Sequence, residues 1–210
     1  MVTVRPAALV AFGALGAAAV APRNAAAQVH WDAGAEIGAM QRFTTGGDPG
    51  AASPRPGPVG EVYAHVALLP LIRLGPYITH DISPLSDGPA RQMTAAGLRV
   101  KLSLPVLDRP WQTWVFAGVG YARTYEPSHV FSARDTFVPG AGGGLLDLRL
   151  GVGLGYRLSR QWEMIAELGG RFGIPVTGSM YERGACGCGE PYVGQDSFAL
   201  SLSVGLSLNE

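Results

Sequence analysis

Charged side chains are scarce in this chain of 210 residues. Asp, Glu, Lys and Arg together make up 15% of it, against about a quarter in typical soluble domains. The 16 basic residues are balanced by 16 acidic ones and form no basic patch, which argues against nucleic acid as a partner. Long apolar runs are also lacking: outside the N-terminus, none reaches the roughly 18 residues that indicate a transmembrane helix.

Cysteine is almost absent, and the two cysteines, Cys186 and Cys188, stand one residue apart. In an exported protein this pair favours a local disulfide. Free thiols and a metal site are the alternatives, although a zinc ion would need two further ligands. We therefore expect no cofactor and no metal site.

The N-terminus has the features of a secretory signal. Arg5 supplies a positive charge, residues 7–21 form a small-residue apolar segment, and the alanines at 25–27 offer a cleavage site. A membrane-anchoring helix is the alternative, but the apolar segment is short and rich in alanine. We therefore expect residues 1–27 to be cleaved and residues 28–210 to form one mature domain.

What the chain has in abundance is strict two-residue alternation, and residues 145–158 show it best. Even positions from Leu146 to Leu158 are apolar or aromatic, whereas odd positions from Asp147 to Arg157 hold charge or glycine. Such alternation indicates a strand whose two faces meet different environments. At about 3.3 Å per residue, the run is long enough to cross a bilayer, which takes about 9–11 residues.

Seven further segments alternate in a similar way, so the sequence predicts eight strands. They cover residues 29–43, 60–69, 72–82, 92–104, 111–125, 145–158, 162–173 and 195–208. Their connections are alternately long and short, as in bacterial outer-membrane barrels with long extracellular loops and short periplasmic turns.

Two strands raise specific questions. In residues 111–125 both faces are apolar, and we assign Val115, Val119 and Tyr121 to the outer face. In residues 72–82, Pro76 cannot donate a ladder hydrogen bond, so we expect a bulge or an unpaired position there.

Aromatic residues gather near the predicted strand ends. Amphipathic rings prefer the headgroup level of a membrane, so this placement predicts two aromatic girdles. The girdle on the short-turn side would hold Tyr156 and all four tryptophans, Trp31, Trp111, Trp114 and Trp162. The girdle near the long loops would hold Phe43, Tyr125 and Phe172.

The face opposite the apolar one collects charges of both signs. The interior of an eight-stranded barrel is just wide enough to be filled by side chains, and buried charges must be paired. We therefore expect an ion network that plugs the lumen, with Glu163 and Glu167 paired to Arg157 and Arg171. Its expected members are Asp32, Glu36, Arg73, Asp81, Arg99, Lys101, Asp147, Arg149, Arg157, Glu163, Glu167 and Arg171.

Residues that could carry catalysis are not arranged for it. Ser128 and His129 are neighbours in a predicted loop, and no carboxylate is placed to orient the histidine. Glu163 and Glu167 would stand about 13 Å apart on one strand face, beyond the roughly 5–10 Å of a glycosidase pair. The sequence predicts no enzyme.

In these features, residues 28–210 resemble the eight-stranded outer-membrane β-barrel family of the OmpA transmembrane domain and OmpX. The resemblance lies in the pattern of strands and loops, and the chain departs from it by ending in Leu208, Asn209 and Glu210 rather than on an aromatic residue. It implies an all-β, antiparallel, up-and-down transmembrane barrel in a Gram-negative outer membrane. The peptidoglycan-binding domain of OmpA is not expected.

We therefore expect a structural or surface-interaction role for a barrel with a plugged lumen and four extracellular loops. Expected partners are outer-membrane lipids, lipopolysaccharide and a surface ligand bound through the loops. A small solute pore and a lipid-modifying barrel enzyme are the alternatives. A soluble, lipocalin-like barrel would turn the leucine face inward, which the loop pattern, the tryptophan positions and the lack of charge on that face oppose.

Overall fold

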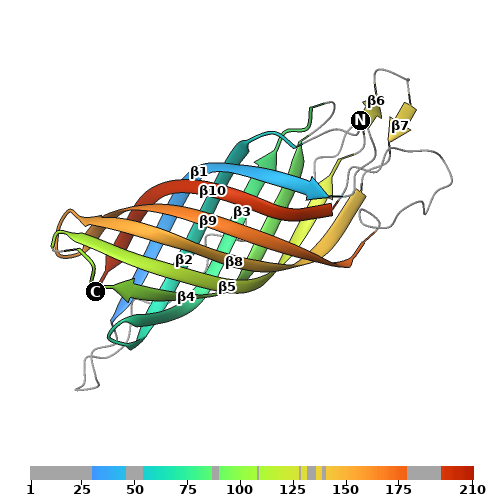
Figure 1. Cartoon of the computed structure of the whole chain (residues 1–210). Helices are drawn as coiled ribbons and strands as arrows, with labels where there is room; N and C mark the ends of the chain where they lie inside the picture. The colour runs from blue at the N-terminus through green and yellow to red at the C-terminus, as the bar shows by residue number, and fades with distance from the viewer. Residues whose placement is uncertain are drawn as a thin grey trace, which may run out of the picture.

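The alternating segments pair edge to edge into a closed, antiparallel barrel of eight strands (Figure 1). The computed structural model describes residues 30–45, 54–86, 90–107, 109–127, 129–131, 136–138, 141–178 and 195–210. The barrel strands are β1 (Trp31–Thr45), β2 (Gly57–Leu69), β3 (Ile72–Ser83), β4 (Arg91–Leu104), β5 (Trp111–Glu126), β8 (Ala141–Arg157), β9 (Trp162–Thr177) and β10 (Gln195–Asn209).

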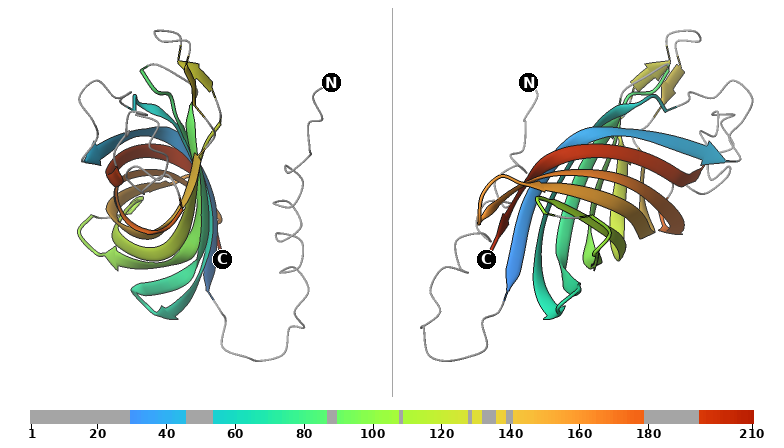
Figure 2. Two further views of the ribbon diagram at one scale, coloured as in Figure 1. Left: turned by 90° about the vertical axis from the view of Figure 1, so that its right-hand side faces the viewer. Right: turned by 60° about the vertical axis from the view of Figure 1, so that its left-hand side comes forward.

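Consecutive strands of the barrel lie side by side, and the sheet closes where the first strand meets the last. β1 pairs with β10 from Asp32 opposite Asn209 to Thr45 opposite Gln195. Closure leaves no free strand edge, and a view close to the barrel axis shows the complete ring (Figure 2). None of the described residues forms a helix long and apolar enough to cross a membrane.

The two ends of the barrel differ. β2–β3, β4–β5 and β8–β9 are joined by short connections at one end, where the C-terminus also lies (Figure 1). A two-stranded hairpin of β6 (His129–Phe131) and β7 (Thr136–Val138) lies beyond the other end, within the β5–β8 connection. The sequence predicted only a loop there, because strands of three residues are too short to show alternation.

The eight predicted strands are all confirmed, and seven of them extend further than predicted at the end near the long connections, whereas β10 begins at residue 195 as predicted. β8 begins at Ala141 rather than residue 145, and β9 continues to Thr177 rather than residue 173. The extensions contain glycine, proline and polar residues, which in the sequence indicate a loop. Pairing with the neighbouring strand overrides that local preference.

Alternation places apolar side chains outside and charged ones inside. Ile37 is 73% exposed and Leu150 is 54% exposed on the outer surface, whereas Asp32 and Arg99 are fully buried in the lumen. The assignment of β5 is also confirmed, because Phe116 points into the lumen while Val119 and Tyr121 are exposed.

Pro76 interrupts one ladder, as expected. The β2–β3 register runs from Tyr63 opposite Tyr77 directly to Val66 opposite Leu74, without pairs at Gly75 and Pro76. On its other side, Pro76 keeps its position opposite Leu98 in β4. The missing donor therefore disturbs only the boundary between β2 and β3.

The aromatic girdles are present, with one correction. At the short-turn end, Trp111 and Trp162 are exposed, and the ring of Trp111 meets that of Tyr156 at 4.9 Å between centroids. At the other end, Phe198 lies 5.7 Å from Phe43 and 5.0 Å from Phe172 between ring centroids.

The expectation that Trp114 belongs to the girdle is wrong. It is only 1% exposed, because the alternation of β5 turns its side chain into the lumen. Proximity to a strand end suggested the girdle, but the face of the strand decides where the ring lies.

A charge placed on the outer face tests the assignment of the two faces. Leu150→Arg puts a cation in the middle of β8, where burial in hydrocarbon costs about 2–4 kcal/mol near the bilayer midplane. We expect a clear loss of folded barrel in lipid vesicles, measured by resistance to unfolding in unheated SDS. Leu158→Arg is the matched control, because Leu158 is exposed just beyond the end of β8. Equal folding of both variants would contradict the assignment.

Candidate functional site in the barrel lumen

The charged interior is built in layers, and the layer nearest the short turns is centred on Asp32. Its carboxylate accepts hydrogen bonds from Arg73 at 2.7 Å and from Lys101 at 3.2 Å. The Nδ1 atom of His65 lies 2.6 Å from the other carboxylate oxygen. One carboxylate on β1 thus joins side chains from β2, β3 and β4.

The middle layer is centred on Glu61 of β2. Arg99 donates to one oxygen of Glu61 at 2.9 Å, and Arg149 donates to the other. Arg99 also donates to Glu167, whose same oxygen accepts the indole N–H of Trp114 at 2.8 Å. These contacts cross the lumen between strands that are not neighbours in the sheet.

The layer nearest the long connections contains two linked carboxylates. Asp81 accepts hydrogen bonds from Arg42 at 2.6 Å and from Arg171 at 3.4 Å. Arg171 also forms a two-pronged contact with Asp147, at 3.0 Å through Nε and 2.9 Å through Nη2. Tyr77 donates its hydroxyl to the same Asp147 at 3.0 Å.

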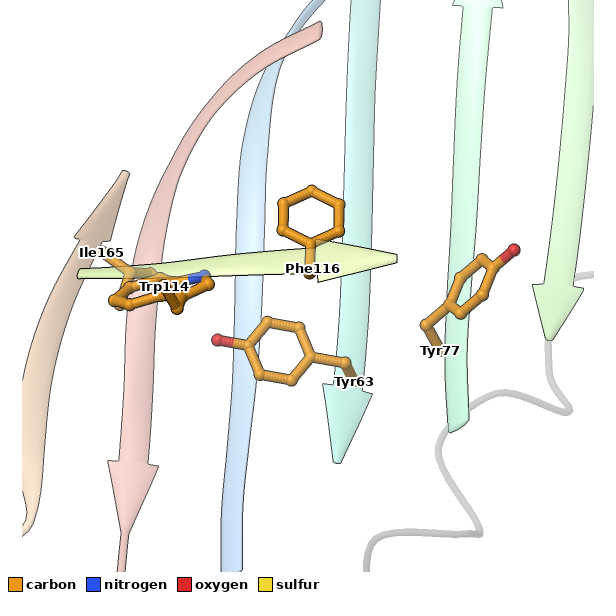
Figure 3. Close-up of a cluster of buried hydrophobic side chains, with 5 residues drawn as sticks. All are labelled: Tyr63, Tyr77, Trp114, Phe116 and Ile165. Carbon is orange, nitrogen blue, oxygen red and sulfur yellow. The ribbon is translucent and has the colours of Figure 1, made fainter. Parts of the chain in front are cut away.

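Aromatic rings fill the space between these charges. The cluster combines Tyr63, Tyr77, Trp114, Phe116 and Ile165, which project inward from four strands (Figure 3). The Arg99 guanidinium lies 4.0 Å from the Phe116 ring centroid and 4.7 Å from that of Tyr63. Cation–π contacts of this kind are favourable where water is excluded, so the rings help to hold the guanidiniums in place.

Inward glycines make room for these rings. A Cβ atom built on Gly153 would lie 2.1 Å from the indole of Trp114, and one on Gly151 would lie 2.4 Å from Phe116. The alternating glycines of β8 therefore leave the space that the two rings on β5 occupy.

Glu36 stands apart because it forms no ion pair with any of the described residues. Ser203 donates a hydrogen bond to one of its oxygens, and the other oxygen has no partner. Glu36, Glu61, Glu167 and Arg149 line a cavity of about 10 Å³, which is about the size of one water molecule. The middle layer thus holds three carboxyl groups and two guanidiniums, and Glu36 is the carboxyl group that forms no ion pair with either guanidinium.

Most of the predicted network residues meet in the lumen. The members that form ion pairs there are Asp32, Arg73, Asp81, Arg99, Lys101, Asp147, Arg149, Glu167 and Arg171. The predicted partners differ from those observed, because Glu167 meets Arg99 rather than Arg171. Glu163 accepts a hydrogen bond from Asn209 at 3.3 Å. Glu163 and Arg157 lie opposite each other in the β8–β9 ladder, but the Arg157 side chain forms no ion pair with a described residue.

Other lumen residues did not enter the prediction. Glu61 and Arg42 continue the inward alternation of β2 and β1, so the pattern could have found them. Arg91 and Glu126, which pair at 3.3 Å, were placed in loops because their strands are one residue longer than predicted. His65 also continues the inward alternation of β2, but its link to Asp32 depends on the register between β1 and β2.

Several candidates lie outside the described residues. These are the predicted signal segment 1–27, Ser128, and the pair Cys186 and Cys188. Within the part of the chain that is described, no group of three or more His, Cys, Asp or Glu residues could hold a metal ion. His65 and His80 lie on opposite faces of the sheet, with His65 buried and His80 exposed.

Comparison with solved structures identifies the architecture. Neisserial surface protein A superimposes with a TM-score of 0.54 over 85% of this chain and 96% of its own, at 11% sequence identity. The chain has the fold of the eight-stranded outer-membrane β-barrels. No family model matches the sequence, and no curated protein is significantly similar to it.

Two further barrels show the same likeness. A major outer membrane protein from Thermus thermophilus gives a TM-score of 0.59 over 88% of this chain and all of its own, at 15% identity. Ail of Yersinia pestis, solved with the heparin analogue sucrose octasulfate, gives 0.51 over 87% and 99%, at 6% identity. At these identities the likeness concerns the fold, and the lumen contacts belong to this chain.

From the contacts of the middle layer, we expect different effects on stability when its two glutamates, Glu61 and Glu36, are replaced. Glu61→Gln removes the carboxylate shared by Arg99 and Arg149, and breaking a buried ion pair costs about 3–5 kcal/mol. Glu36→Gln removes a carboxyl group that forms no ion pair with a described residue, so we expect an unchanged or higher stability. The free energy of unfolding by urea in lipid vesicles measures both effects. Equal destabilisation by the two variants would contradict the assignment of ion pairs in this layer.

Proposed function

We propose that this protein is an integral outer-membrane barrel with a sealed lumen, which acts as a scaffold presenting its long connections to the cell exterior. The observation that carries the proposal is the combination of an apolar outer surface with a filled, ion-paired interior. The scaffold would have no catalytic role of its own. Its partners would be outer-membrane lipids, lipopolysaccharide and a surface ligand bound by the connections.

The outer surface supports the membrane location. Large apolar side chains stand about half exposed along every barrel strand, among them Val62, Leu98, Val152, Leu168 and Val204. Contiguous apolar surface of this extent is unfavourable in water, and the girdles at its two ends match the headgroup levels of a bilayer. The long connections would face outward, as in other outer-membrane barrels.

The interior supports a sealed barrel rather than a pore. The rings of Trp114 and Phe116 and the side chain of Arg99 are buried where a channel would run. A second lumen cavity, near Arg42 and Asp147, also has a volume of about 10 Å³. Cavities of one water each do not form a continuous path for solutes.

One pair in the lumen resembles part of a catalytic site. Asp32 orients the ring of His65 as a carboxylate orients a general base. Both side chains are buried, however, and His65 is only 1% exposed, so a substrate has no access to them. The contacts with Arg73 and Lys101 give Asp32 a structural role instead.

Cell fractionation tests the membrane location. After expression from its own signal segment in a Gram-negative host, we expect the full chain to sediment with the outer membrane and to resist extraction by carbonate. An apolar outer surface that meets hydrocarbon on all sides explains this resistance. Recovery in the soluble periplasmic fraction would overturn the proposal.

Planar-bilayer recording tests the seal. The wild-type barrel is expected to show no steady single-channel openings, because paired side chains fill its lumen. The double variant Arg99→Ala with Glu167→Ala removes a cation and its anion together, so it should give small openings without a large charge imbalance. Steady openings of the wild-type protein would instead support the solute-pore alternative.

A further inference from the structure

The outer surface is not uniform, because a groove crosses β1, β2 and β3 toward the long connections. Its volume is about 920 Å³. Gly60 and Ala35 line it together with larger apolar residues that include Ile37, Val62 and Ile78. A Cβ atom built on Gly60 would meet only one atom, the carbonyl oxygen of Glu36 at 3.8 Å. The missing side chain at position 60 thus leaves open space on the membrane side.

A polar row on the same outer face begins at this groove. His80 lines the groove and lies with its Nδ1 atom 2.9 Å from the hydroxyl of Thr94. His80, Thr94 and Arg123 are direct neighbours across β3, β4 and β5, and all three are exposed. Since paired strands lie about 4.8 Å apart, the row spans about 10 Å.

Arg123 is unusual for a lipid-facing position. It makes no ion pair with any described residue, and it lies between Tyr121 and Tyr125 on the outer face of β5. The strand ends three residues later, at Glu126. A cation on the lipid face is tolerated near the headgroup level, where its cost falls to about 0–1 kcal/mol, and tyrosines prefer the same level. The position therefore brings a guanidinium to the depth at which lipid phosphates lie.

We propose that this surface binds lipopolysaccharide, with an acyl chain in the groove and a phosphate at the row of His80, Thr94 and Arg123. Arginine is well suited to phosphate because its guanidinium donates two parallel hydrogen bonds. The apolar groove and the cationic row adjoin each other, which matches a ligand that carries both a phosphate and acyl chains.

The inference rests on the proposed membrane location. In that orientation the row lies at the end of the long connections, in the outer leaflet. Lipopolysaccharide is the phosphorylated lipid of that leaflet, so it is preferred to a glycerophospholipid.

Two variants separate the groove from the polar row. Gly60→Leu adds an apolar side chain to the groove at a position where a Cβ atom has room, and Arg123→Gln removes the guanidinium from an exposed site. The matched controls are Ala64→Leu, on the same face of β2 but outside the groove, and Arg160→Gln, exposed in the short β8–β9 connection.

Binding of purified lipid A to the detergent-solubilised full-length barrel is measured by native mass spectrometry. Each test variant should weaken binding by roughly tenfold, the factor set by the loss of one good contact. Both controls should bind like the wild type.

Two further probes identify the chemistry of the ligand. Dephosphorylated lipid A should bind more weakly to the wild type but equally to the wild type and Arg123→Gln. Phosphatidylglycerol should bind to the wild type more weakly than lipid A does. Equal binding of lipid A by Gly60→Leu, Arg123→Gln and the wild type would overturn the inference. Binding of phosphatidylglycerol to the wild type as tightly as lipid A would also overturn it.

Fractionation separates this inference from the proposed function. A barrel that sediments with the outer membrane but whose variants bind lipid A normally retains the scaffold role and loses the groove site. A barrel recovered in the periplasm loses both.

Discussion

The structure depends on one constraint: a surface in contact with hydrocarbon can expose neither an unpaired backbone group nor an unpaired charge. Closure of β1 onto β10 satisfies the backbone, because it removes the strand edges. Period-two alternation then sends every second side chain inward. Most charged side chains of the strands are therefore confined to a narrow lumen, where buried cations need anions within reach. The ion network is therefore a consequence of barrel closure and of the alternation of side chains along the strands.

Alternation was sufficient to predict the strands, their faces and the inward position of most charges, because a two-residue period is recorded directly in the sequence. Partners across the lumen were beyond its reach. Glu167 meets Arg99 because closure of the barrel brings β9 and β4, which are separated in the sheet by β8 and β5, within reach of each other across the lumen. A one-dimensional pattern places both residues inside the barrel but does not fix which of them share a layer. The same limit explains why the outer groove at Gly60 was not foreseen, since it is formed by side chains from separate strands.

Pro76 and Trp114 show two ways in which local chemistry meets the fold. At Pro76 the local chemistry prevails, because proline has no backbone N–H to donate and the β2–β3 ladder lacks a pair at this position. At Trp114 the alternation of the strand prevails instead and turns the side chain into the lumen. Its indole N–H is satisfied by Glu167 inside the lumen, so a ring that usually favours the interface becomes part of the interior.

The cross-lumen pairs have a consequence for assembly. Glu61 on β2 meets Arg149 on β8, and Asp32 on β1 meets Lys101 on β4. A single inserted hairpin would therefore carry charges whose partners arrive only with later strands, and it would expose them to lipid. Partly inserted intermediates are disfavoured for this reason. The charge pattern favours concerted entry of all eight strands, with curling and insertion proceeding together.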